Sequence, residues 1–231
     1  MKMERIKMHN AQDTIEQRPH GKILTSFPKL IDGPVYLNGH NAVSSYGANS
    51  YFIKSQGGNW LVDSPRFDPA LVEQFRKWGG IRYIFLTHRD DVADADRYAR
   101  AFGADRIIHE GDRSAQPDAE MILKGDEDVV MAPARLIHTP GHTRGHGVLL
   151  WNGKYLFTGD HLSWSPEDQA LRSGRDYCWY SWKEQTRSVE KLARHAGIEW
   201  VLPGHGGRKQ VPVGEFPKWV QETAQWMKGR T

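Results

Sequence analysis

Residues 138–143 read His-Thr-Pro-Gly-His-Thr, and this short stretch organises the rest of the 231-residue chain. It follows the apolar residues 136–137 and contains a Pro-Gly turn, which holds its side chains on fixed backbone at the end of a predicted strand. Three other turns have the same form, namely residues 87–91 (Thr-His-Arg-Asp-Asp), 158–161 (Thr-Gly-Asp-His) and 203–206 (Pro-Gly-His-Gly). Because these turns supply His and Asp side chains, they predict a metal site assembled from distant parts of the chain.

The composition is that of a folded protein with a substantial core. Hydrophobic residues make up 39% of the chain, and nine of its residues are Trp. Charged residues make up 26%, but their signs nearly cancel and leave a formal net charge of +3. The Lys and Arg residues are scattered, whereas a nucleic-acid interface is normally a basic stripe or patch. We therefore expect a small-molecule substrate and no nucleic-acid partner.

The single cysteine, Cys178, excludes a disulfide within the chain and any structural zinc site built from cysteines. One free thiol fits a reducing compartment. Residues 1–20 are polar and lack the apolar stretch of a secretory signal. No apolar run approaches the ~18 residues of a membrane-spanning helix. These features predict a cytoplasmic protein that does not enter a membrane.

Hydrophobic patterning predicts strands that alternate with helices. Runs rich in β-branched and aromatic residues predict strands at residues 35–37, 50–53, 60–62, 83–86, 105–109, 135–137, 148–151, 155–157 and 200–202. Apolar residues at helical spacing predict helices over residues 71–78, 92–102, 189–196 and 216–223. The polar residues 110–128 are predicted to form a surface excursion, and residues 161–181 an irregular segment. Without a repeat or a linker, residues 1–231 are predicted to form a single domain, with residues 1–30 as an N-terminal arm.

The order and spacing of these motifs resemble the metallo-β-lactamase fold superfamily. The resemblance covers residues 50 to 207 and is carried by five stretches: Trp-Leu-Val-Asp (60–63), Phe-Leu-Thr-His (85–88), His-Thr-Pro-Gly-His-Thr (138–143), Leu-Phe-Thr-Gly-Asp (156–160) and Leu-Pro-Gly-His (202–205). It implies an α/β fold, the αβ/βα four-layer sandwich, with two β-sheets packed together and helices outside. It also implies a dinuclear metal site at one edge of the sheets.

Carried over by position, the resemblance implies that His88, His142, Asp160 and His205 are metal ligands, with Asp160 bridging two ions. The family's first motif is usually His-x-His-x-Asp-His, and this chain departs from it. Asp90 stands at the second His position, so we expect a carboxylate ligand there.

The rest of the first motif can be aligned in two ways. Without an insertion, Val92 and Ala93 stand where the Asp-His pair is expected. With two inserted residues, Asp94 takes the Asp role and Ala95 stands at the His position. Under either alignment at least one usual imidazole is missing.

Other side chains could compensate for the missing imidazole. Asp91, His146 and His161 are candidates for further metal ligands or for neighbours of the ligands. Additional carboxylates make a site harder and move its preference from zinc towards iron or manganese. Relatives with an acidic residue at the second His position, the flavodiiron-type proteins, hold iron. The alternative is that Asp90, Asp91 and Asp94 simply begin the following helix, whose N-terminus favours carboxylates.

The region after Asp160 usually shapes the substrate site in this superfamily. Trp164, Tyr177 and Trp179 are predicted to form an apolar wall or a lid over the metals. The alternative is that these aromatic side chains only tie a long loop to the core. Arg172 in the same region either binds an anionic group of the substrate or contacts only solvent.

The first functional hypothesis is a hydrolase that holds one or two divalent ions (zinc, or iron or manganese) and attacks its substrate with a metal-activated water. Asp94 is the candidate to orient or deprotonate that water. An ester, thioester or lactone-like small molecule is the expected substrate, by analogy alone. Two alternatives stay open: a non-haem iron redox protein, and a non-catalytic binding protein with a degraded metal site. The sequence predicts no oligomeric state.

Overall fold

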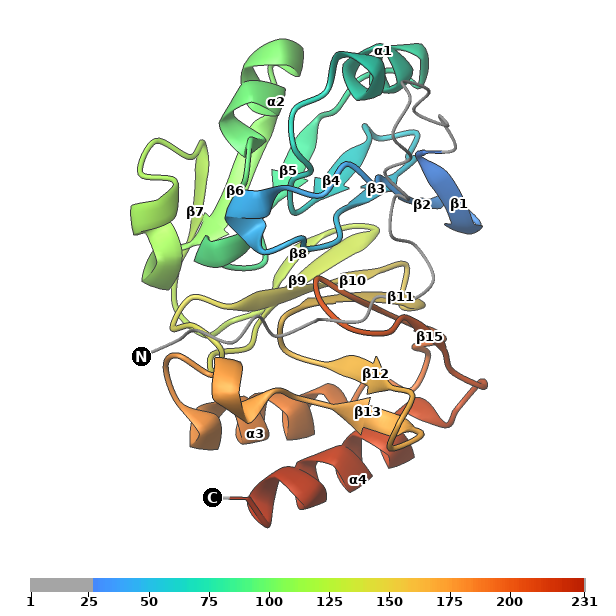
Figure 1. The fold of residues 1–231 in the computed structure, drawn as a ribbon, viewed down its shortest axis with the longest axis vertical. Coiled ribbons are helices and arrows are strands. Elements are labelled where there is room, and N and C mark those ends of the chain that lie inside the picture. The colour runs from blue at the N-terminus through green and yellow to red at the C-terminus, as the bar shows by residue number, and fades with distance from the viewer. Residues whose placement is uncertain (1–26, 231) are drawn as a thin grey trace, which may run out of the picture.

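The structure is a computed structural model that describes residues 27–230, so most of the expected N-terminal arm lies outside the described residues. Two β-sheets pack face to face, and two helices cover the outer face of each sheet (Figure 1). From top to bottom, Figure 1 shows helices, sheet, sheet and helices. The predicted αβ/βα four-layer sandwich is therefore confirmed.

The first sheet has seven strands in sequence order. Its strands are β1 (Lys29–Asp32), β2 (Val35–Leu37), β3 (Tyr51–Ile53), β4 (Trp60–Val62), β5 (Tyr83–Phe85), β6 (Asp105–His109) and β7 (Met121–Leu123). Strands β1 to β4 are antiparallel, whereas β4 to β7 are parallel. Parallel neighbours need a crossover: α1 (Pro69–Lys77) lies between β4 and β5, α2 (Ala95–Phe102) between β5 and β6, and the 3₁₀ helix η3 (Glu110–Ala115) between β6 and β7. Helix α1 is capped by Asp68, whose side chain accepts a hydrogen bond from the Ala70 amide at 2.8 Å.

The second sheet has six strands in the order β15-β14-β11-β10-β9-β8. They are β8 (Val129–Met131), β9 (Ala134–His138), β10 (Gly147–Trp151), β11 (Tyr155–Gly159), β14 (Trp200–Pro203) and β15 (Lys209–Gln210). A hairpin joins β10 to β11 through residues 152–154, where the Lys154 amide donates to the Trp151 carbonyl at 3.0 Å. Asn152 and Gly153 have φ angles of 52° and 67°, which suit this tight turn. Helices α3 (Trp182–Leu192) and α4 (Phe216–Lys228) cover this sheet.

The strands carry apolar side chains on both faces because both faces are buried. In β10, Leu149 and Trp151 point into the core between the sheets, whereas Val148 and Leu150 contact the core beneath α3 and α4. The same alternation in the first sheet fills a third core beneath α1 and α2. Continuous apolar runs in the sequence therefore correspond to central strands of a layered fold.

Two segments contain more regular structure than their sequence predicted. Residues 110–128 hold the 3₁₀ helix η3 (Glu110–Ala115) and the edge strand β7 rather than only a surface excursion. The irregular segment 161–181 contains a small hairpin of β12 (Ser163–Ser165) and β13 (Ala170–Arg172), followed by η4 (Arg175–Tyr177). These elements are short and half-exposed, so their residues lack the apolar periodicity that marks central strands.

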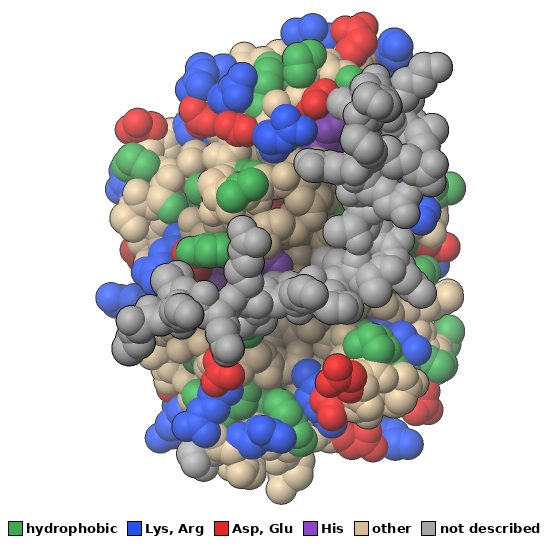
Figure 2. Space-filling view, in the orientation of Figure 1, with side chains coloured by type: hydrophobic (Ala, Val, Ile, Leu, Met, Phe, Trp, Pro, Cys, Tyr) green, Lys and Arg blue, Asp and Glu red, His purple; other side chains and the backbone are tan. Residues whose placement is uncertain are grey.

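The surface is mixed in charge on the face drawn in Figure 2. Lys and Arg side chains alternate there with Asp and Glu side chains, apart from the part of the face drawn in grey. No helix within residues 27–230 has the length and apolarity needed to cross a bilayer.

Candidate metal centre

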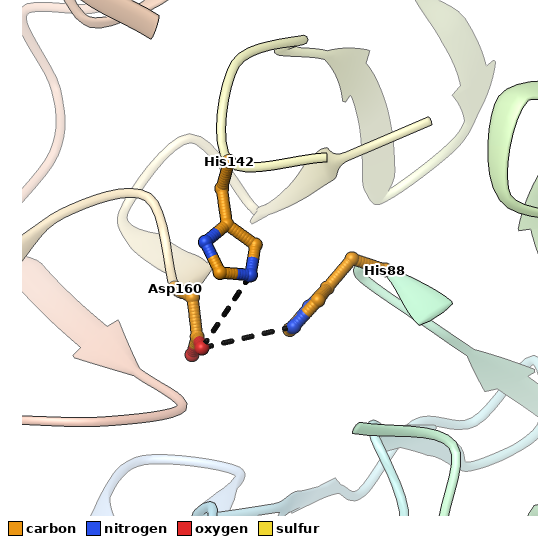
Figure 3. A group of neighbouring side chains, drawn as sticks. All are labelled: His88, His142 and Asp160. Carbon is orange, nitrogen blue, oxygen red and sulfur yellow. Dashed lines mark ion pairs between the residues drawn. The ribbon is translucent and has the colours of Figure 1, made fainter. Parts of the chain in front are cut away.

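Four strand ends deliver the predicted His and Asp side chains to one edge of the two sheets. His88 follows β5, Asp160 follows β11 and His205 follows β14, while His142 lies in the loop after β9. Figure 3 shows the rings of His88 and His142 turned towards the carboxylate of Asp160. The Nε2 atoms of both rings lie 3.7 Å from Asp160 Oδ2. Residues separated by more than 70 positions therefore converge, as the motifs predicted.

Asp90 joins this first group of side chains. Its Oδ2 lies 3.5 Å from His142 Nε2 and 4.0 Å from His88 Nε2. Asp90 belongs to η2 (Arg89–Asp91), a 3₁₀ turn that begins directly after His88. The first group thus consists of His88, Asp90, His142 and Asp160.

A second group shares Asp160 with the first. His205 Nε2 lies 3.8 Å from Asp160 Oδ2 and 3.9 Å from Asp91 Oδ1. One ligand atom from each of Asp91, Asp160 and His205 can therefore face a common ion. Since Asp160 faces both groups, its carboxylate is placed between two candidate ion positions.

Within the described part of the chain, most donor atoms of the two groups are buried without a hydrogen-bond partner. His88 Nε2, His142 Nε2, Asp90 Oδ2 and both carboxylate oxygens of Asp91 are buried without a hydrogen bond among the described residues. Two ligands about 2.1 Å from a tetrahedral ion lie about 3.4 Å apart. The separations within the two groups, 3.5–4.0 Å, are close to this value. The residues therefore fit divalent cations, because buried polar atoms rarely remain unpaired.

Burial prepares the charge states of these donors. Desolvation lowers the pKa of His88 to about 4, although Asp160 opposes the shift, so the imidazole is neutral as a ligand requires. Burial, together with the negative charges of Asp160, Asp63 and Asp90, raises the pKa of Asp91 well above its usual range. The neighbouring His142 ring lowers the pKa of Asp90. A cation between these carboxylates would offset both their desolvation and their mutual repulsion.

A buried Asp-Thr pair orients the His88 ring. Thr87 Oγ1 lies 2.9 Å from both oxygens of Asp63 and 3.0 Å from His88 Nδ1. If the hydroxyl donates to Asp63, it accepts from Nδ1–H, and Nε2 is left free to bind a cation. Burial raises the pKa of Asp63 to about 8, against the lowering effect of its bonds to Thr87. In the sequence, Asp63 was noted only as the residue that ends a strand. Its place beside His88 arises because β4, which precedes Asp63, pairs in parallel with β5, which precedes His88.

Asp94 is not brought to the site, which corrects the prediction that it orients the water. Its Oδ2 instead accepts a hydrogen bond from the Phe67 amide at 2.7 Å, and it does not line the cavity above the metal groups. Asp91 occupies that place because the tight turn of η2 already directs its side chain between Asp160 and His205. No two-residue insertion is needed to bring a carboxylate there.

His146 and His161 lie behind the donor groups and belong to neither of them. Both are fully buried; the ring of His146 lies 5.3 Å from that of His88 and stacks on that of His161 at 5.1 Å. Burial lowers the pKa of His161 to about 3 and that of His146 well below its usual range. Two neutral imidazole rings therefore pack behind His88, and neither is a member of the two donor groups.

A cavity of about 600 Å³ opens above the two groups. Donor residues of both groups line its floor, and aromatic side chains line its walls together with Leu162, Arg89 and Arg172. The aromatic side chains are the predicted Tyr177 and Trp179 and one unpredicted residue, Tyr46. Tyr46 follows η1 (Val43–Ser45) in a polar loop, where no periodicity distinguished it from an ordinary surface residue.

Trp179 is fixed beside the His142 turn. Its amide donates to the His142 carbonyl at 2.8 Å, while 58% of its side chain remains exposed at the cavity. The Cys178 thiol donates to the Gly141 carbonyl at 3.1 Å, and burial raises the pKa of the thiol, so it is poorly suited to act as a nucleophile. The loop therefore ties an aromatic wall directly to a candidate ligand.

Trp164 does not line the cavity, and this part of the predicted pocket is wrong. The residue lies in β12, where its ring packs against Trp219 with centroids 5.5 Å apart and beneath the Lys209 ammonium at 3.9 Å. The β12-β13 hairpin was not predicted, and it directs this side chain towards α4 instead.

Comparisons with known proteins agree with this geometry. The family model of the metallo-beta-lactamase superfamily matches residues 45–205. A hydroxyacylglutathione hydrolase from Anaeromyxobacter dehalogenans is 33% identical over 69% of this chain and 62% of its own length. Another, from Pelagibacter ubique, is 31% identical over 49% of this chain and 50% of its own length. The chain thus matches between half and two thirds of these relatives.

Solved structures share the fold at low sequence identity. The DIM-1 metallo-beta-lactamase superposes with a TM-score of 0.68 over 87% of this chain and 96% of its own, at 18% identity. A superfamily protein from Sulfolobus tokodaii gives a TM-score of 0.59 over 85% and 87%, also at 18% identity. At this identity the likeness concerns the fold alone.

Proposed function

This chain belongs to the metallo-beta-lactamase superfamily, and from that premise we propose that it is a metal-dependent hydrolase that cleaves a thioester. The relatives at 33% and 31% identity are hydroxyacylglutathione hydrolases, and an acylglutathione is a thioester. Because only part of those relatives is matched, we propose the type of bond that is cleaved, a thioester, and do not specify the thiol that it releases.

The observation that carries this proposal is the pair of donor groups that share Asp160 on the floor of an open cavity. In the proposal, His88, Asp90 and His142 hold one cation, Asp91 and His205 hold a second, and Asp160 binds both. Such cations polarise a carbonyl and lower the pKa of a bound water towards neutrality. The surrounding protein keeps the His88 imidazole neutral, and its described residues offer few of the donor atoms a competing hydrogen-bond partner.

The donor set bears on the identity of the metal. Three imidazoles and three carboxylates make a harder set than imidazoles alone, which favours iron or manganese beside zinc. The same carboxylates favour the second candidate function, a non-haem iron redox protein. An activity assay combined with metal analysis separates the two, because a redox protein predicts iron with a visible absorption band and no thioester hydrolysis.

The cavity walls favour a substrate with an apolar or aromatic part. Tyr46, Tyr177 and Trp179 offer planar surfaces near the mouth, where buried aromatic contact stabilises a ligand effectively. Arg89 and Arg172 add positive charge to the lining, which suits a carboxylate on the same substrate.

The proposal is tested by removing and restoring the metals. Purified protein is analysed for zinc, iron and manganese and then assayed against aryl and alkyl acyl thioesters, a lactone and a β-lactam. We expect thioester cleavage that a chelator abolishes and added metal restores. Cleavage that persists in chelated, metal-free protein would overturn the proposal.

A further inference from the structure

A buried carboxylate outside the two donor groups connects their loops. Asp112 lies in η3, within the segment predicted to be a surface excursion, yet its side chain is 0% exposed. Its Oδ2 accepts hydrogen bonds from the Arg89 amide at 3.1 Å and from the Thr143 hydroxyl at 2.5 Å, and its Oδ1 accepts one from the Gly145 amide at 3.1 Å. Each of these three hydrogen bonds reaches one of the two turns that carry His88 and His142.

The backbone is shaped to allow this contact. A Cβ atom at Gly145 would lie 2.4 Å from the Asp112 amide nitrogen, and one at Gly111 would lie 2.8 Å from the Gly145 nitrogen. Both distances are shorter than real Cβ contacts, so η3 and the loop after His142 touch through two glycines. This close approach places the Asp112 side chain between the two turns.

We infer that Asp112 is a positioning residue that sets the distance between His88 and Asp90 on one turn and His142 on the other. Arg89 lies between His88 and Asp90 in the chain, and Thr143 follows His142 directly. Two of the three hydrogen bonds come from the backbone amides of Arg89 and Gly145, and the third comes from the Thr143 hydroxyl, so all three hold the turns that carry the proposed ligands. None of these three hydrogen bonds joins Asp112 to the His205 turn. The inference rests on the proposed metal centre and assigns Asp112 to its first donor group alone.

The carboxylate form is required because all three partners are donors. An Asn at this position has the same shape but replaces one oxygen by an NH₂ group. If the NH₂ group takes the Oδ1 place, it faces the Gly145 amide; if it takes the Oδ2 place, it faces the Arg89 amide. Asp112→Asn therefore leaves at least one backbone donor unpaired without changing the packing volume.

The test measures zinc affinity by calorimetric titration in two single-site backgrounds prepared free of metal. The His205→Ala background keeps the first group, and the His142→Ala background keeps the second. In the first background we expect Asp112→Asn to weaken zinc binding about 10- to 100-fold, the usual cost of losing a partner that orients a ligand. In the second we expect a change within about twofold, as for independent sites. Asp118→Asn, an exposed change of the same kind in the same segment, should alter neither.

Two outcomes would overturn the inference: unchanged affinity in the His205→Ala background, or equal losses in both backgrounds, which would mean general loosening of the fold. If Asp112→Asn does not fold, Thr143→Val removes one of the three bonds from the opposite side and must show the same selectivity. Failure of the metal centre itself is distinguishable, because the unsubstituted chain would then bind no zinc, iron or manganese.

Discussion

Replacing Asp91 by Asn should stabilise the metal-free protein and weaken its metal binding. The Asp91 side chain is 1% exposed, and neither of its oxygens has a hydrogen-bond partner among residues 27–230. Burial and the charges of Asp160, Asp63 and Asp90 raise its pKa, which shows that the charged form is disfavoured there. An Asn of the same shape removes this cost but provides a poorer ligand.

The magnitudes follow from these two roles. Relief of a buried, mutually repelling carboxylate should raise the free energy of unfolding without metal by about 1–2 kcal/mol. For a chain of this length that corresponds to a rise in Tm of about 2–8 °C. Loss of a residue that only orients a ligand lowers metal affinity about 10- to 100-fold. Loss of Asp91, a direct ligand in the proposal, should lower the affinity for the second cation by at least as much. The stabilisation conferred by saturating metal should then fall by about 1.4–2.7 kcal/mol.

Calorimetric melting curves with chelator and with zinc measure both effects on one sample. The matched control is Asp94→Asn, which keeps an oxygen for the Phe67 amide and should change neither the metal-free Tm nor the zinc-induced shift. The reasoning is refuted if Asp94→Asn abolishes the zinc-induced shift while Asp91→Asn retains it. It is also refuted if Asp91→Asn lowers the metal-free Tm.

Three further predictions concern other parts of the site. His142→Ala should lose at least one equivalent of bound metal, measured by elemental analysis. The control is His138→Ala, which should keep the full metal content because the His138 ring pairs with Asp126 at 2.8 Å. Equal metal contents in the two variants would contradict the assignment of His142 as a ligand. Trp179→Ala should raise KM for an aryl thioester about 10-fold with little change in kcat, because Trp179 lines the cavity. Trp164→Ala should instead lower Tm without changing KM, because Trp164 packs against Trp219. The opposite pattern would contradict the assignment of Trp179 to the cavity wall. In metal-free protein, burial lowers the pKa of His161 to about 3, so its contribution to stability is present above about pH 6.5 and is lost as the pH falls towards 3. His161→Leu should therefore gain stability relative to the unsubstituted protein by about 1.4 kcal/mol per pH unit over that range in urea titrations, and a constant difference would argue against the shift.

The central strands and the strand-end donors were predictable from local sequence. Apolar runs such as Tyr83–Phe85 and Gly147–Trp151 are continuous because both faces of each strand are buried, so such strands can be recognised in the sequence. Each donor stands a few residues beyond such a run. Strands β11 and β14 are parallel neighbours in the second sheet, so the ends that carry Asp160 and His205 lie at a common edge. His88 follows β5 of the first sheet and joins them because the two sheets pack face to face.

The first motif shows where spacing stops being informative. Asp91 and Asp94 are both acidic and both follow His88, and alignment with the usual motif favoured Asp94. The choice depends on whether the chain turns tightly after His88, and η2 makes that turn within three residues. A turn of this kind is stabilised by contacts with other segments, including the bond from the Arg89 amide to Asp112.

By itself the sequence determined the central strands and the turns that present His88, Asp90, His142, Asp160 and His205, because strand periodicity and Gly-Pro punctuation are local properties. The layered arrangement of those strands was implied by the resemblance to the superfamily. Only the tertiary structure decided that Asp91 faces the second group, that Trp179 rather than Trp164 lines the cavity, and that Asp112 is buried between two loops. These assignments depend on which distant segments pack together. A polar residue in a half-exposed segment has the same local sequence whether it meets solvent or the backbone donors of a neighbouring loop.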